Sequence, residues 1–200
     1  ADLSEVVGEK AQNYISQGKS HTEFYEVDGK LYFATHVGYY EMIDGAQQLP
    51  VNAPEGYKLY PGGHFLSYDL KTKEIKDLAV IPDEGILSMT MDKQRMHLYG
   101  ISWPSGYFYH YDIQNNVLTN AGLISGLGER GKRGDDYRVL CRSLIVDPDT
   151  GYVYYSTSEG DIFYYDPATR VIKKLEDMNL RLDYFGKFDP KDAGSMGYNW

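Results

Sequence analysis

The sequence predicts an all-β fold of four-stranded antiparallel units, and three observations support this prediction. A segment made of Gly, four further residues and Tyr-Asp occurs three times, as GHFLSYD (63–69), GYFYHYD (106–112) and GDIFYYD (160–166). An Ile or Leu follows each Asp after six positions, and a second short apolar run precedes each copy. Such repeats, with four short strands in each copy, are typical of a β-propeller, in which every repeat forms one blade.

Each unit divides into four expected strands separated by turn-forming residues. In the first unit the expected strands cover residues 21–28, 30–37, 63–70 and 74–81. In the second unit they cover residues 86–92, 95–103, 106–113 and 117–124. In the third unit they cover residues 141–147, 151–158, 161–166 and 170–176. The recurring Asp69, Asp112 and Asp166 end the third strand of each unit, so we expect them to accept hydrogen bonds from the backbone of the following turn.

The repeats divide the chain into three predicted blades with flanking segments. The blades are expected over residues 21–82, with an insertion at 37–62, and over residues 84–124 and 139–178. Residues 1–20 are expected to form a short helix or the end of a preceding blade, and residues 179–200 a linker and the start of a next blade. Because three blades cannot close a ring, we expect a larger ring of six to eight blades, completed by further sequence or by other chains. A self-contained four-bladed domain is the alternative.

The turn after the third strand carries a family resemblance. It reads YDLKTK, YDIQNN and YDPATR in the three units. Over residues 21–178 the chain resembles the broad YVTN, NHL and quinoprotein-like β-propeller superfamily. The resemblance implies the architecture alone, because these propellers include lyases, lactonases, dehydrogenases and binding scaffolds.

Charge and composition exclude some classes of protein. The net charge is −9, from 20 basic and 29 acidic residues, which argues against a general nucleic-acid-binding protein. The apolar runs are too short for a membrane span. The start ADLSEVV fits the mature end left by signal-peptide cleavage, although an engineered start would look the same. A periplasmic or secreted location is therefore expected ahead of a cytoplasmic one.

Three histidines are predicted to lie on the face that carries the long connections. In a propeller, the start of a blade's first strand, the end of its second and the start of its third share one face, where His21, His36 and His64 fall. The long connections 37–62 and 125–138 lie on the same face, where binding and catalysis are usually found. Three converging imidazoles would hold a divalent metal ion, the one cofactor that the sequence suggests. The alternative is three separate histidines with independent hydrogen bonds.

Aromatic and basic residues gather near the same face. Tyr39 and Tyr40 in the insertion, and Trp103 at the end of a second strand, could stack on a sugar or another flat ligand. In ERGKRGDDYRVLCR (129–142), Arg138 and Arg142 lie in a locally basic segment suited to an anionic ligand such as a uronate. The alternatives are rings that pack the insertion onto its blade, and a solvated loop with internal salt bridges.

Two functions follow from these candidates. The first is a propeller that binds a small-molecule or oligosaccharide ligand on the long-loop face, as a metal-assisted lyase or a lactonase-type hydrolase. His21, His64 and Arg142 would then be catalytic, with His or Arg groups removing a proton and stabilising a carboxylate. The second is a non-catalytic scaffold that binds other protein chains through exposed blade edges.

Overall fold

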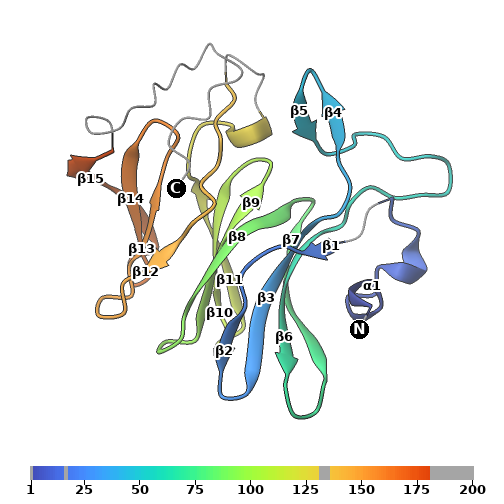
Figure 1. The fold of residues 1–200 in the computed structure, drawn as a ribbon, viewed down its shortest axis with the longest axis horizontal. Coiled ribbons are helices and arrows are strands. Elements are labelled where there is room, and N and C mark those ends of the chain that lie inside the picture. Colours follow the sequence, from blue (N-terminus) through green and yellow to red (C-terminus); the bar gives the residue numbers. More distant parts are fainter. Residues whose placement is uncertain (1, 16–17, 131–135, 181–200) are drawn as a thin grey trace.

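The three repeats form three antiparallel sheets that stand side by side along the molecule (Figure 1). The computed structural model describes residues 2–15, 18–130 and 136–180. Within each sheet the strands are hydrogen-bonded neighbours in chain order, as consecutive hairpins require. The fold is all-β, and the sheets have the form of propeller blades, which confirms the fold class predicted from the repeats.

The blades have the following strands. The first blade contains β1 (Gly18–Ser20), β2 (Tyr25–Val27), β3 (Lys30–Val37), β6 (Gly62–Asp69) and β7 (Ile75–Pro82). The second contains β8 (Gly85–Asp92), β9 (His97–Trp103), β10 (Tyr107–Asp112) and β11 (Val117–Leu123). The third contains β12 (Ile145–Val146), β13 (Val153–Ser156), β14 (Asp161–Asp166) and β15 (Val171–Asn179).

Smaller elements lie outside the blades. The N-terminal segment contains α1 (Leu3–Val6) and the 3-10 helix η1 (Lys10–Gln12), and the long loop before the third blade contains η2 (Gly128–Arg130). The insertion of the first blade carries the hairpin of β4 (Glu41–Ile43) and β5 (Ala46–Gln48), which projects away from the sheets (Figure 1). None of the helices in the described ranges is long and apolar enough to cross a membrane. The predicted start of a next blade within 179–200 lies almost entirely outside the described residues.

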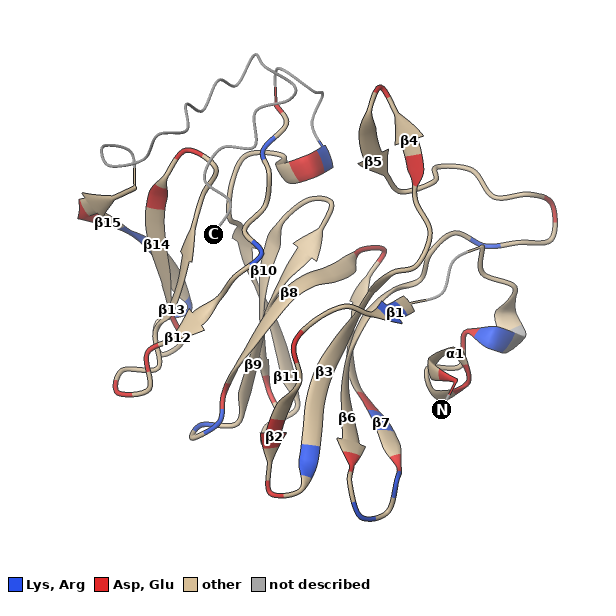
Figure 2. Ribbon diagram, in the orientation of Figure 1, with Lys and Arg blue, Asp and Glu red and all other residues tan. Residues whose placement is uncertain are grey.

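The hydrophobic core lies between the sheets. One buried cluster, which includes Phe65, Ile86 and Met89, joins the first blade to the second. The other, which includes Phe108 and Tyr165, joins the second blade to the third. The middle blade is covered on both faces, so every residue of β8 is buried. Figure 2 shows the consequence for charge, because Lys, Arg, Asp and Glu gather at the turns and loops and leave the middle of the sheets almost free of charge.

The repeated Asp and Gly have separate structural roles. The carboxylates of Asp69, Asp112 and Asp166 accept backbone N–H bonds of 2.9 to 3.3 Å from the turns that follow, which confirms their predicted role. The repeated Gly lies at the start of the third strand: Gly63 is the second residue of β6, and Gly106 and Gly160 directly precede β10 and β14. Gly106 and Gly160 adopt φ values of +81° and +86°, which disfavour other residues.

The first strands of the outer two blades differ from the prediction. The strand expected over 21–28 is interrupted, because β1 and β2 both pair with β3 while residues 21–24 lie between them. The strand expected over 141–147 is reduced to the two residues of β12. Side chains replace part of the missing ladder: the Thr22 Oγ1 accepts a 2.9 Å hydrogen bond from the Ala34 N–H. Apolar periodicity predicts such strands but does not reveal these interruptions.

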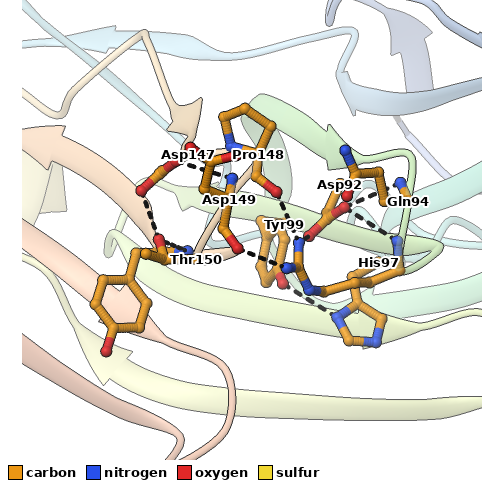
Figure 3. A network of polar contacts seen from close by, with 10 residues as sticks. Asp92, Gln94, His97, Tyr99, Asp147, Pro148, Asp149 and Thr150 are labelled. Carbon is orange, nitrogen blue, oxygen red and sulfur yellow. Dashed lines mark hydrogen bonds and ion pairs between the residues drawn. The ribbon is translucent and has the colours of Figure 1, made fainter.

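A polar network joins the second and third blades at the short-turn face (Figure 3). The carboxylate of the buried Asp92 accepts a hydrogen bond of 2.8 Å from the Arg95 guanidinium. Arg95 also donates to the carbonyl oxygens of Pro148 at 3.3 Å and Asp149 at 3.0 Å in the third blade. The guanidinium therefore bridges the first turns of two adjacent blades and complements the apolar core between them.

Candidate functional site

A cleft opens where the first strands of the three blades meet. It has a volume of about 710 Å³ and is bounded by residues 21–23, 87–89 and 142–145, one segment from each blade. We call it the inner cleft. His21, Glu23 and Arg142 supply its ionisable groups, and Thr22, Ser88 and Ser143 supply hydroxyl groups. A cavity of this size with a few converging polar groups fits a small polar ligand.

All three first strands depart from regular pairing at the level of the inner cleft. Residues 21–24 interrupt the first blade, and residues 139–144 precede the short β12 in the third. In the second blade the register of β8 shifts between Ile86 and Ser88, which leaves Leu87 as an extra residue. Irregular pairing of this kind is frequent next to functional sites, because it redirects side chains and main-chain groups.

His21 spans the gap between the first and second blades. Its Nδ1 lies 3.3 Å from the carbonyl oxygen of Leu87, which can only accept a hydrogen bond. Nδ1 therefore carries the proton in this contact, and Nε2 of the neutral ring is left as a hydrogen-bond acceptor. His21 is exposed and lines the inner cleft, so this nitrogen is suited to contact a ligand.

His36 lies behind His21 and is buried. The two ring centroids are 5.0 Å apart. The centroids of the His36 and Trp103 rings are 5.4 Å apart, and these two rings are in an edge-to-face arrangement. Burial, followed by the charges of His21, Lys19 and Arg142, lowers the pKa of His36 to about 3. His36 is therefore neutral at physiological pH and supports His21 through ring packing.

A buried carboxylate connects the tryptophan with the arginine of the inner cleft. Glu129 of η2 accepts the Trp103 indole N–H at 2.8 Å and the Leu140 backbone N–H at 3.0 Å. The same carboxylate lies 2.6 Å from the Arg142 guanidinium. Trp103 is 2% exposed, so its predicted role as a stacking surface for ligand is wrong: the ring is part of the core and its N–H orients Glu129.

Arg142 is directed toward the inner cleft by fixed partners on one side. Besides Glu129, its guanidinium donates to the carbonyl oxygen of Leu140 at 2.7 Å. The side chain remains 41% exposed and lines the cleft. A guanidinium held in this way is suited to bind a carboxylate at lower entropic cost than a free arginine.

The other basic residues of the loop are engaged elsewhere. Arg138 pairs with Glu159 of the third blade at 2.7 Å and is not among the residues that line the inner cleft. Arg130 donates to the Ser105 hydroxyl at 3.1 Å. Lys132 and Arg133 lie outside the described residues. Of the described basic residues of the loop, Arg138 and Arg142 form internal salt bridges, and Arg142 is the one that borders the cleft.

His64 does not line the inner cleft, and its hydrogen-bond partners lie elsewhere. Its Nδ1 lies 3.0 Å from the carboxylate of Asp77, and its Nε2 lies 3.1 Å from Glu9 Oε1. Burial opposes the charge on this ring, but the hydrogen bonds and charges of Asp77 and Glu9 outweigh burial and raise the pKa of His64 to about 9. A protonated imidazole has no lone pair for a metal.

The three predicted metal ligands therefore do not converge. His21 and His36 are adjacent, whereas both ring nitrogens of His64 are bonded to carboxylates. Within the described ranges no group of three or more His, Cys, Asp or Glu is placed to hold a metal ion. The arrangement does not fit the divalent metal centre that the histidines suggested, and His64 does not fit a catalytic role at the cleft.

Tyr39 and Tyr40 separate in the structure. Tyr39 lines a second pocket of about 540 Å³ between the N-terminal segment and the insertion, together with Tyr14 and Tyr57. Tyr40 is not among the residues that line this pocket, and Lys19 Nζ lies 5.9 Å from the centre of its ring. Neither tyrosine borders the inner cleft.

Sequence reasoning did not identify several residues of the site. Glu129 gives no sequence signal of its own, because its partners Trp103 and Leu140 are 26 and 11 residues away in the chain. Ser88 lies inside an apolar strand and gives no separate signal. Thr22, beside His21, gives no separate signal either, because its hydrogen-bond partner Ala34 lies across the sheet.

Comparisons with known proteins are limited to shape. No family model matches the sequence, and no curated protein is similar to it. One solved structure of similar shape is a chain of the nidogen/laminin complex, at 11% identity over 74% of this chain and 42% of that chain, with a TM-score of 0.42. Another is the extracellular domain of a putative one-component system from B. thetaiotaomicron, at 16% identity over 78% of this chain and 22% of that chain, with a TM-score of 0.40. Apo AztD from Citrobacter koseri matches at 13% identity over 80% of this chain and 48% of that chain, with a TM-score of 0.42.

The chain spans between about a fifth and about half of the length of these structures. Such low identities and TM-scores carry no functional information, so the propeller assignment rests on the topology of the three sheets. Membership of the YVTN, NHL and quinoprotein-like superfamily stays a prediction.

Proposed function

We propose that this protein binds a small, polar, carboxylate-bearing molecule in the inner cleft. The observation that carries the proposal is Arg142, which lines the cleft with a side chain that is 41% exposed, while Glu129 and the Leu140 carbonyl hold its guanidinium. Hydroxyl groups from all three blades border the same space and suit a ligand that carries several hydroxyls. A uronate combines a carboxylate with such hydroxyls and is the ligand class that these groups fit.

Replacement of Arg142 by Gln is expected to weaken the binding of galacturonate at least tenfold, because a charge-assisted hydrogen bond to the ligand is lost. Isothermal titration calorimetry measures this change. Arg170→Gln is the matched control, because Arg170 is exposed in a turn of the third blade and is absent from the cleft. Equal losses in the two variants, or no galacturonate binding by the unmodified protein, would contradict the proposal.

The same cleft is suited to lyase chemistry. The His21 Nε2 lone pair takes a proton from the carbon next to the bound carboxylate, the C–H electron pair forms a C=C bond, and the substituent on the next carbon leaves with its bonding pair. Arg142 stabilises the negative charge that collects on the carboxylate. Lactonase-type hydrolysis would use the same base to activate water. The leaving oxygen takes up the proton that His21 has removed, or one from solvent, so the base and the charge stabilisation come from His21 and Arg142.

His21→Gln is expected to reduce the elimination of digalacturonate at least a hundredfold and to change its binding by less than about threefold, because a general base acts in the transition state. The formation of the conjugated double bond is followed by ultraviolet absorbance, and binding by calorimetry. His97→Gln serves as the control, since His97 bonds to the Tyr99 hydroxyl at the other end of its blade. Unchanged elimination in His21→Gln would exclude it as the base, and the binding proposal would stand on Arg142 alone.

A further inference from the structure

A second pocket lies between the N-terminal segment and the insertion of the first blade, and main-chain hydrogen bonds build its frame. The Lys58 N–H donates to the Asn13 carbonyl oxygen at 2.9 Å, and the Ile15 N–H donates to the Lys58 carbonyl oxygen at 2.8 Å. These bonds form an isolated parallel bridge between Tyr14 and Lys58. Two segments that are distant in the chain are thereby held together, and the pocket has a defined shape.

Tyrosine rings form the walls of this pocket, which we call the tyrosine pocket. Tyr14, Tyr39 and Tyr57 line it, and Tyr39 and Tyr57 are 50% and 55% exposed. Large aromatic side chains contribute more to stability when they are buried, so two half-exposed rings around one cavity mark a binding surface. The volume of about 540 Å³ is within the range of sites for small molecules.

The polar groups of the tyrosine pocket indicate the ligand class. Glu41 and Asn52 reach the same space as the rings and can accept and donate hydrogen bonds to hydroxyl groups. Glu41 is the one charged residue among the described residues that line the pocket, and no Lys or Arg is among them. Lys58 Nζ lies 5.4 Å from the centre of the Tyr14 ring but is not among the lining residues, so the lining itself offers no cation to pair with a carboxylate, whereas the inner cleft has Arg142 beside Glu23.

We propose that the tyrosine pocket binds a neutral sugar, at the scale of one or two rings. The C–H faces of a sugar pack on tyrosine rings while its hydroxyl groups bond to Glu41 and Asn52. The pocket is also much larger than a quaternary ammonium group, the other ligand for which aromatic walls and one carboxylate are suited. This site is independent of the function proposed for the inner cleft.

The test uses the whole chain and three neutral disaccharides, cellobiose, maltose and lactose, each at millimolar concentration. Saturation-transfer difference NMR detects binding, and calorimetry measures the affinity. Tyr57→Ala and Tyr39→Ala are each expected to weaken the binding of the preferred disaccharide roughly fivefold to tenfold, because each removes a stacking surface. Tyr40→Ala is the matched control, because Tyr40 is a neighbouring exposed tyrosine of the insertion that does not line the pocket.

The outcomes separate this site from the inner cleft. Loss of disaccharide binding in Tyr57→Ala, with unchanged binding in Tyr40→Ala and Arg142→Gln, supports the tyrosine pocket. The proposal is overturned if none of the disaccharides binds, or if Tyr57→Ala binds as well as the unmodified protein. It is also overturned if tetramethylammonium or a proline-rich peptide binds through Tyr57 more tightly than every disaccharide. Galacturonate binding should be the same in Tyr57→Ala and in the unmodified protein.

Discussion

His64→Ala is expected to lower the free energy of unfolding at pH 7 by about 3–5 kcal/mol, because removal of one partner leaves a buried charge unpaired. Glu9 is 4% exposed and its Oε1 lies 3.1 Å from His64 Nε2. Its second oxygen, Oε2, is buried without a hydrogen-bond partner among the described residues. The Glu9 carboxylate would thus lose its one strong contact, and the N-terminal segment would lose its anchor on the first blade.

The dependence of stability on pH provides a second readout for His64. The folded-state pKa of about 9 exceeds the ordinary value of 6.5, so the folded protein binds more protons than the unfolded chain between these two values. This contribution to stability is complete below about pH 6.5 and is lost as the pH rises through 9. The pKa shift of His64 corresponds to a loss of about 3 kcal/mol in the free energy of unfolding across this pH interval.

Urea denaturation at several pH values between 6 and 10 measures both effects. The unmodified protein should lose stability toward pH 9, whereas His64→Ala should have a flatter profile in this range. Asp77→Asn is the comparison variant: it removes the more exposed carboxylate, keeps the buried contact with Glu9, and should therefore flatten the profile only in part and cost less stability than His64→Ala. Identical alkaline slopes in the unmodified protein and His64→Ala would show that His64 is not protonated in the folded state.

Glu129→Ala is the other substitution with a large expected effect, again about 3–5 kcal/mol. It leaves the Trp103 N–H and the Leu140 N–H as donors without an acceptor in the core, and it removes the partner of Arg142. Trp103 is 2% exposed, and in a Trp200→Phe background, which removes the second tryptophan of the chain, its fluorescence reports on the packing around this carboxylate. We expect a red-shifted emission maximum and a lower denaturation midpoint.

Glu129→Gln tests whether the charge or the shape of this side chain matters. The amide can still accept one of the two N–H bonds, so the loss should be smaller than with Ala, while galacturonate binding should fall because Arg142 is no longer oriented. The control is Glu159→Gln, which breaks the more exposed ion pair with Arg138 and should cost less than about 1 kcal/mol. A Glu129→Ala protein as stable as Glu159→Gln would contradict the proposed role of the buried carboxylate.

The blade pattern could be predicted from the sequence because its signals are local. The recurring Asp69, Asp112 and Asp166 bond to turns only two or three residues away, so one chain segment contains both partners. The alternation of apolar residues likewise reports on pairing between consecutive strands. The interruption at residues 21–24 could not be predicted in this way, because the Thr22 side chain satisfies the Ala34 backbone across the sheet.

The candidate site was predicted only in part. Strand direction placed His21, His36 and Arg142 near one face, and the structure brings them around one cleft and its wall. The same rule placed His64 with them, but it does not specify which way a strand residue points or which carboxylates surround it. Glu9 and Asp77 decide the charge of His64, and neither is recognisable as its partner from spacing.

The all-β fold, the three repeats and the turn chemistry are predictable from the amino-acid sequence, because each depends on residues that are close in the chain. Which of the predicted residues share a cavity, and which are buried, depends on how the blades pack. Trp103 has the same sequence signal as an exposed ring, and it is in the core because Glu129, 26 residues later, accepts its N–H there. Burial and electrostatic pairing depend on contacts between blades, and these contacts are set by packing after the strands have formed.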